Sequence, residues 1–135
     1  MGHRNEVRTD VLIIGGGIAG AFAAINAKEG GADVVLVDKA FFGRGGVSAL
    51  ASGAYSAYVP GDDLASWVNA ASSTPLVNRG LAEKAILQTY DRLMDMERWG
   101  VKWVKEGGKI AREYSGGSGF PIKTSAMMAE VGPQI

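Results

Sequence analysis

Glycines near the N-terminus have the spacing of a nucleotide-binding turn. The segment Gly15-Gly-Gly-Ile-Ala-Gly20 matches the pattern G-x-G-x-x-G. In this pattern Gly15 makes a tight turn, Gly17 lets the backbone approach a pyrophosphate, and Gly20 lets a helix pack closely against a strand. The amides and the positive dipole at the start of that helix, at Ile18 and Ala19, attract phosphate charge. We therefore expect these residues to bind a dinucleotide.

An acidic residue narrows the choice of dinucleotide. Asp38 lies eighteen residues after Gly20, where dinucleotide-binding folds place the residue that accepts hydrogen bonds from a ribose hydroxyl. A carboxylate there repels a 2′-phosphate, and NADP is therefore disfavoured. The turn alone leaves FAD and NAD open. A glycine-rich turn that binds nothing is the structural alternative, and the surrounding strand, helix and acid argue against it.

A second stretch of small residues follows the acid. Lys39 comes directly after Asp38, and the loop Gly45-Gly-Val-Ser-Ala-Leu-Ala-Ser-Gly-Ala54 comes next. Together with the first turn, these segments resemble the flavoprotein subunits of the succinate dehydrogenase and fumarate reductase family. That family has the pattern G-G-x-S/T-x-x-A-x-G-G in this loop. The chain departs from the pattern at the last glycine, which is Ala54 here, and matches it at Gly45, Gly46, Ser48, Ala51 and Gly53.

The resemblance implies FAD as the cofactor. In the family this loop passes along the FAD pyrophosphate and the flavin ring. The resemblance also implies hydride transfer between the flavin and a small substrate in the full-length protein, and it allows an electron-transfer subunit as a partner. It covers about residues 9–58 and again the segment from Leu93 to Trp103. The cofactor-binding residues that it adds to those of the first turn and Asp38 are Lys39, Gly45, Gly46, Ser48 and Gly53.

Val47 bears on how the cofactor is held. Membrane-bound members of the family attach FAD covalently through a histidine in this loop, and alignment of the small residues places Val47 at that position. The single histidine of the chain, His3, is near the N-terminus. We therefore expect noncovalent FAD. The family also more often has glutamate where this chain has Asp38, so the acid here is one methylene group shorter.

A strand–helix–strand unit must position the first turn. Residues 10–14 are a short run of mainly β-branched residues and predict a parallel strand buried on both faces. Residues 18–29 are rich in alanine and predict a helix buried on most sides, which Gly30 and Gly31 end. Residues 33–38 predict the second strand. With the resemblance, the expected fold class is α/β: a Rossmann-like βαβ dinucleotide-binding unit of a glutathione-reductase-like FAD domain.

The segment after the second strand has a sequence that is typical of little regular structure. Residues 40–61 are rich in glycine, alanine and serine and predict an extended loop with one short helix over 47–51. Asp62 or Asp63 can cap a short helix that runs through Ala71.

The clearest helix lies over residues 78–99. Asn78 can cap it, and apolar residues recur on one face at helical spacing, which is typical of a helix packed on a core. Residues 101–104 alternate like a strand and precede a glycine turn. The tail beyond Ser115 is rich in glycine and serine and predicts no closing element. The residues of the apolar face are Ala82, Ile86, Tyr90, Leu93 and Met96.

Composition excludes several classes of function. The 135 residues are 47% hydrophobic and 21% charged, as in soluble globular proteins. The formal net charge is zero, which argues against nucleic acid as a partner. There is no cysteine and one histidine, so we expect no metal site. The uncharged run over residues 11–27 contains too many glycines for a transmembrane segment, and we expect a cytoplasmic protein.

The expected organisation is a flexible leader over residues 1–8 and the N-terminal part of an FAD-binding domain over residues 9–135, incomplete at its C-terminus. The resemblance places the family's catalytic arginine and its capping domain beyond residue 135, so we expect no catalytic residue within the chain and no activity of the chain alone. Two other interpretations stay open. One is another FAD- or NAD-binding fold, such as a thiazole-synthase-like protein. The other is a non-enzymatic dinucleotide-binding module.

Overall fold

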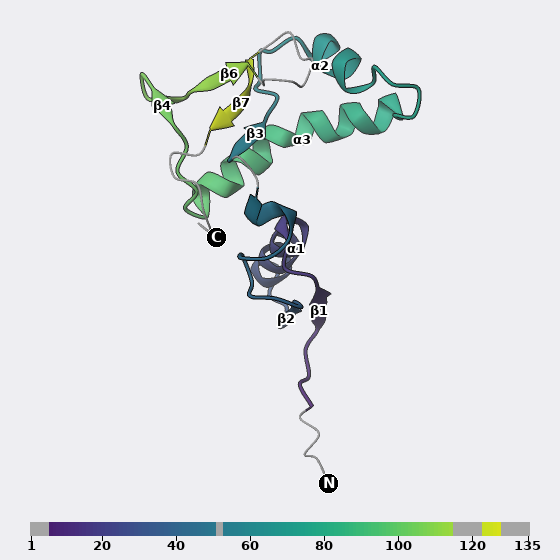
Figure 1. Ribbon diagram of the computed structural model, residues 1–135, viewed down its shortest axis with the longest axis vertical. Coiled ribbons are helices and arrows are strands. Elements are labelled where there is room, and N and C mark those ends of the chain that lie inside the picture. Colours follow the sequence, from purple (N-terminus) through teal and green to yellow (C-terminus); the bar gives the residue numbers. More distant parts are fainter. Residues whose placement is uncertain (1–5, 51–52, 115–122, 128–135) are drawn as a thin grey trace. The chain divides into compact units, whose positions relative to one another are not determined.

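The computed structural model describes residues 6–50, 53–114 and 123–127 (Figure 1). The chain divides into two compact units, residues 1–51 and residues 52–135. Most of the predicted leader lies outside the described residues, so the expected division at residue 8 stays a prediction. Within the described part of the chain, no helix combines the length and the apolar character needed to cross a membrane.

The first unit contains the predicted strand–helix–strand arrangement. Its elements are β1 (Val11–Ile14), α1 (Ile18–Glu29) and β2 (Val34–Val37). The two strands are parallel, with Val11 opposite Val34 and Ile14 opposite Val37. The predicted helix is confirmed at both ends, because the glycine turn before it and Gly30 after it are strong local signals. The predicted fold class is therefore confirmed.

The expectation that the first strand is buried on both faces is wrong. Leu12 is 57% exposed and Ile14 is 82% exposed. The expectation that the helix over residues 18–29 is buried on most sides is also wrong, because Ala21 is the one buried residue of α1. The reason is that α1 packs against one face of a two-stranded sheet, so alternate side chains of β1 face away from it. Among the described residues of this unit, nothing covers the other face.

The loop after β2 contains one turn of 3-10 helix, η1 (Val47–Leu50), close to the predicted short helix. Small residues with little periodicity cannot sustain a longer helix here.

The second unit contains two helices and short antiparallel strands. The helices are α2 (Leu64–Ala71) and α3 (Arg79–Arg98). Both predicted caps are confirmed: the Asp63 side chain accepts from the Ala65 amide at 3.0 Å, and Asn78 accepts from the Leu81 amide at 3.1 Å. The strands are β3 (Ala54–Ser56), β4 (Lys105–Glu106), β5 (Lys109–Ile110), β6 (Arg112–Tyr114) and β7 (Lys123–Met127).

The strand predicted over residues 101–104 is wrong, and no strand was predicted where β3 to β7 lie, including the tail beyond Ser115. Residues 101–104 are not a regular strand, and the hairpin of β4 and β5 begins at Lys105. Strands β3 and β7, neither of them predicted, pair in a sheet of order β3-β7-β6. Tyr55 lies opposite Ala126 in this pairing. Contacts between segments so distant in sequence leave no local pattern in either of them.

Packing between the two helices forms the core of the second unit. Trp67 and Val68 of α2 are buried against Ile86 of α3. The predicted apolar face of α3 is confirmed, since Ile86, Leu93 and Met96 are all buried.

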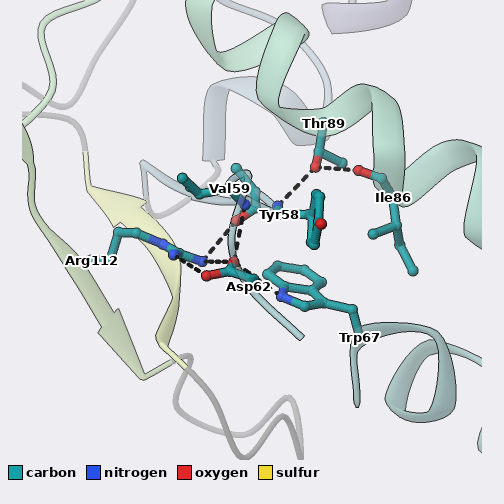
Figure 2. Close-up of polar contacts among 8 residues, drawn as sticks. Tyr58, Val59, Asp62, Trp67, Ile86, Thr89 and Arg112 are labelled. Carbon is teal, nitrogen blue, oxygen red and sulfur yellow. Dashed lines mark hydrogen bonds and ion pairs between the residues drawn. The ribbon is translucent and has the colours of Figure 1, made fainter. Parts of the chain in front are cut away.

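An ion pair holds the loop before α2 to β6, as Figure 2 shows. The Arg112 guanidinium donates to both carboxylate oxygens of Asp62, at 2.9 and 2.7 Å, and to the Ala57 carbonyl at 3.0 Å. Asp62 also accepts from the Val59 amide and from the Trp67 indole. Burial alone would raise the pKa of Asp62, but the hydrogen bonds from Arg112, Val59 and Trp67 outweigh it and lower that pKa.

Candidate functional site

An open cleft lies at the carboxyl ends of β1 and β2. Its volume is about 410 Å³, within the range of roughly 300–1,000 Å³ that is usual for small-ligand sites. Parallel α/β sheets bind ligands at this edge. The lining residues come from the ends of both strands, the glycine turn, the loop before η1 and the first residue of η1: Ile14, Gly15, Gly16, Gly17, Val37, Asp38, Lys39, Ala40, Gly45, Gly46 and Val47.

Two glycines have the structural roles that the pattern predicts. Gly15 has a φ of 104°, a conformation that side chains rarely allow, and its amide donates to the Val37 carbonyl at 2.8 Å. A Cβ atom on Gly20 would lie only 1.9 Å from the Gly15 carbonyl oxygen. The turn and the close packing of α1 on β1 therefore both require glycine. Cofactor binding at these residues stays a prediction.

The start of α1 adjoins the cleft, because the lining residue Gly17 directly precedes the helix. Gly17 is the N-cap residue and has no side chain that could cap the helix. The first intrahelical bond runs from the Ala21 amide to the Gly17 carbonyl at 2.9 Å. Amides of a first turn, such as those of Ala19 and Gly20, have no carbonyl partner within their own helix. The predicted residues Ile18, Ala19 and Gly20 belong to this turn rather than to the lining of the cleft.

Asp38 has partners that the sequence analysis did not foresee. Its Oδ1 atom accepts from the Ala40 amide at 2.9 Å, and its Oδ2 atom accepts from the Gly16 amide. These two amides, Ala40 first and Gly16 second, lower the pKa of Asp38 below its ordinary value. The carboxylate is therefore ionised at neutral pH. The predicted ribose acceptor also ties the glycine turn to the end of β2.

The second predicted segment, Lys39 and the loop over residues 45–54, is divided between the two units. Lys39, Gly45 and Gly46 line the cleft together with the first turn. Ser48 lies in η1, but its side chain is outside what the structure describes. Gly53 belongs to the second unit, where it is buried just before β3.

Two further residues bear on the cleft, one in its lining and one beside the lining residue Gly16. Val47, which the resemblance aligns with the family's histidine, lines the cleft and is 86% exposed. Phe42 was not singled out from the sequence, yet a Cβ atom on Gly16 would lie 2.7 Å from Phe42 Cδ2. The one sequence signal that could have pointed to this contact is Gly16 itself. The pattern accepts any residue at this position, so a glycine there indicates that another group approaches closely.

The cleft fits the ADP half of a dinucleotide. Glycines let a ligand approach the backbone, the start of a helix favours a pyrophosphate, and an ionised carboxylate suits a ribose hydroxyl. A second cavity, of about 500 Å³, lies between α3 and the β4–β5 hairpin. Its charged residues are largely paired, with Glu97 bound to Lys105 at 2.5 Å and Arg112 bound to Asp62. The second cavity is therefore the weaker candidate.

Comparisons with known proteins cover both segments of the site. The family described as FAD binding domain matches residues 10–131. An uncharacterized FAD-dependent oxidoreductase of Methanocaldococcus jannaschii is 32% identical over 118 residues, which are 84% of this chain and 22% of that protein.

Solved structures of flavoproteins are similar to this chain over most of its length. Sdh1 of Mycobacterium smegmatis, in complex with UQ1, has a TM-score of 0.74 at 28% identity and covers 93% of this chain, which matches 21% of Sdh1. The open conformation of a flavocytochrome c3 fumarate reductase has a TM-score of 0.73 at 26% identity and covers 93% of this chain, which matches 23% of that protein.

The chain thus spans about a fifth of the length of the relatives that it matches. The family match includes the glycine turn, Asp38 and the loop over residues 45–53. The resemblance on which we based FAD as the cofactor is therefore confirmed. The chain belongs to the FAD binding domain family, in the form found in succinate dehydrogenase and fumarate reductase flavoproteins.

Proposed function

We propose that this chain is the N-terminal, FAD-binding part of a longer flavin-dependent oxidoreductase that transfers hydride between the flavin and a small substrate. The observation that carries the proposal is the glycine-lined cleft at the carboxyl edge of β1 and β2, within the residues that match the family. Bound FAD supplies the group that accepts or donates the hydride. The family match favours this proposal over an NAD-binding fold and over a module without enzymatic function.

The residues of the cleft have separate roles in this proposal. Gly17 and the start of α1 bind the pyrophosphate, because glycine admits the phosphate and the helix dipole attracts its charge. Asp38 accepts a ribose hydroxyl. Lys39 lies beside Asp38, and Gly45 and Gly46 leave room for the cofactor toward its flavin side.

The catalytic groups belong to the remainder of the longer protein. Asp38 and Lys39 are the charged residues among those that line the cleft, and the proposal assigns both to the cofactor. The chain also spans about a fifth of its relatives. The small substrate and an electron-transfer subunit are the partners that the proposal implies for the longer protein. A cytoplasmic location stays a prediction.

We also propose that FAD is held noncovalently. Val47 lines the cleft at the position of the family's attaching histidine, and its aliphatic side chain cannot form a bond to the flavin. No histidine is present in the sequence after His3.

The test of the site is a substitution in the glycine turn of the full-length protein. Gly17→Val places a branched side chain in the path of the pyrophosphate, and we expect the purified protein to lose its bound flavin. Gly80→Val is the matched control, because Gly80 also lies at a helix start and a Cβ atom there meets only Asn78 Oδ1, at 3.5 Å. Normal flavin content in Gly17→Val would show that the assignment of the site is wrong.

Acid precipitation tests the mode of attachment. We expect all flavin absorbance to remain in the supernatant when the protein is precipitated. Flavin fluorescence on a proteolytic peptide that contains Val47 would contradict noncovalent binding at this loop.

A further inference from the structure

One carboxylate joins the two chain segments that form the cleft. Asp38 Oδ2 accepts from the Gly16 amide of the glycine turn, and Asp38 Oδ1 accepts from the Ala40 amide at 2.9 Å. Gly16 follows β1, whereas Ala40 lies in the loop that leads from β2 to Gly45. The Asp38 side chain therefore connects the backbone segments that leave the two strands.

The space around Gly16 shows how closely these segments approach. A Cβ atom on Gly16 would lie 2.8 Å from Asp38 Oδ2 and 2.7 Å from Phe42 Cδ2. Both distances are shorter than a normal contact, so a side chain at position 16 would displace both the carboxylate and the ring. The pattern accepts any residue at this position, and the approach of Asp38 and Phe42 explains why it is glycine in this chain.

The two hydrogen bonds from backbone amides leave Asp38 able to bind a ribose. An ionised carboxylate has about four acceptor positions, and the amides of Gly16 and Ala40 occupy two of them. A ribose hydroxyl can donate to a remaining position while the hydrogen bonds from both backbone amides persist. Binding the ribose and holding the turn are therefore compatible roles of one side chain.

We propose that Asp38 is a positioning residue for the diphosphate-binding turn, in addition to being a ribose acceptor. The inference rests on the proposed function, since it concerns how the same cleft binds the diphosphate of FAD. Without the carboxylate, the Gly16 amide loses its acceptor, and the bond from the Gly15 amide to the Val37 carbonyl is left to hold the turn to the end of β2. The start of α1, which follows Gly17, is then no longer held in register with the loop opposite it.

The test compares adenosine with ADP as competitors of FAD on the full-length protein. The two ligands share the ribose and differ in the diphosphate, so the ratio of their dissociation constants measures what the phosphates contribute. In Asp38→Asn, one oxygen is replaced by an amide group that donates, so one backbone amide is left without its acceptor. We expect the advantage of ADP over adenosine to fall about tenfold, because hydrogen bonds to a charged group are among the stronger ones.

Asp10→Asn is the matched control. The Asp10 carboxylate accepts from the Asp33 amide at 2.9 Å, at the opposite ends of the same two strands. This variant therefore also weakens an acid-to-amide bond between the strands, but not at the cleft. We expect the advantage of ADP to be unchanged.

Gly16→Ala reaches the same contact from the other side. The added Cβ atom displaces the carboxylate but leaves Asp38 in the sequence to bind the ribose, so the advantage of ADP should again fall. The double variant Gly16→Ala/Asp38→Asn should fall no further than the stronger single variant, because both substitutions break one contact.

Equal weakening of adenosine and ADP in Asp38→Asn would overturn the proposal, since that is the result expected of an acid that contacts only the ribose. Additive effects in the double variant would also overturn it. If circular dichroism shows that Asp38→Asn does not fold, Gly16→Ala decides, and an unchanged advantage of ADP there overturns the proposal. A wild-type protein that does not bind FAD contradicts the proposed function instead, so the two failures are distinguishable.

Discussion

Replacement of Gly20 by alanine tests how α1 is seated on β1. A Cβ atom at this position would lie 1.9 Å from the Gly15 carbonyl oxygen and 3.5 Å from Ile13 Cγ2. The first distance is impossible for carbon and oxygen that are not bonded, and the oxygen belongs to the backbone of the turn. Relief requires α1 to move away from the turn by about 1 Å, because real contacts of this kind are about 3.0 Å or longer.

Two opposing effects determine the size of the change. Alanine is favoured over glycine in a helix by about 0.8–1.0 kcal/mol. Overpacking costs typically about 1–3 kcal/mol, and a clash with backbone is at the upper end because no rotamer change relieves it. We therefore expect Gly20→Ala to lower the free energy of unfolding by about 1–2 kcal/mol. Since the start of α1 must shift, FAD affinity should fall by at least about tenfold.

Gly30→Ala is the control at the other end of the same helix. Gly30 has φ −74° and ψ 0°, and a Cβ atom there would lie 3.3 and 3.4 Å from two carbonyl oxygens of the preceding turn. We expect its stability and FAD affinity to match those of the wild type within about 0.5 kcal/mol. The measurements are urea unfolding and titration of the apoprotein with FAD. Wild-type values for both quantities in Gly20→Ala would refute the argument from close packing.

Two further predictions concern the second unit and the chain as a whole. Asp62→Asn should destabilise the protein by about 1–3 kcal/mol at pH 7, because Arg112 is left without its carboxylate partner. The pKa of Asp62 is lowered in the folded protein, so the stabilisation by its ion pair is complete above about pH 4–5 and is lost as the pH falls below 3.8. Urea unfolding at pH 7 and pH 3 measures how much stability Asp62→Asn loses, with Asp91→Asn as the exposed control. A loss as large at pH 3 as at pH 7 would contradict the prediction. Residues 1–135 alone should bind FAD at least about 100-fold more weakly than the full-length protein and show no turnover, because ordering only two residues of the loop over residues 45–53 on binding already costs about 2–4 kcal/mol. Equal affinities of the two proteins in calorimetry would show that the remainder of the protein does not support this loop.

Local signals explain what the sequence could predict. The turn at Gly15, the helix over residues 18–29 and the caps at Asp63 and Asn78 each depend on residues within a few positions of one another. Such signals need no knowledge of the fold. The cleft was predictable for the same reason, since the pattern of glycines and the acid after β2 together specify a strand–helix–strand unit.

What could not be predicted depends on contacts between distant segments. The pairing of β3 with β7 joins Tyr55 to Ala126, and the ion pair of Asp62 joins it to Arg112. Neither partner has a pattern that names the other. The bond from the Gly16 amide to Asp38 is of the same kind, although its two residues belong to motifs that were each recognised. The sequence patterns predict that both motifs lie at one cleft, but they do not predict the contact between them.

The two halves of the cleft differ in what holds them. On the polar side, the Gly15 amide binds the Val37 carbonyl at 2.8 Å, and Asp38 binds the amides of Gly16 and Ala40. These bonds lie within one strand–helix–strand unit, so the surface that we propose for the ADP half is formed by local backbone. On the apolar side, Ile14 and Val47 are more than four-fifths exposed. Apolar walls of this kind are completed by atoms that cover them, so under the proposed function we expect the flavin side of the cleft to depend on the remainder of the longer protein.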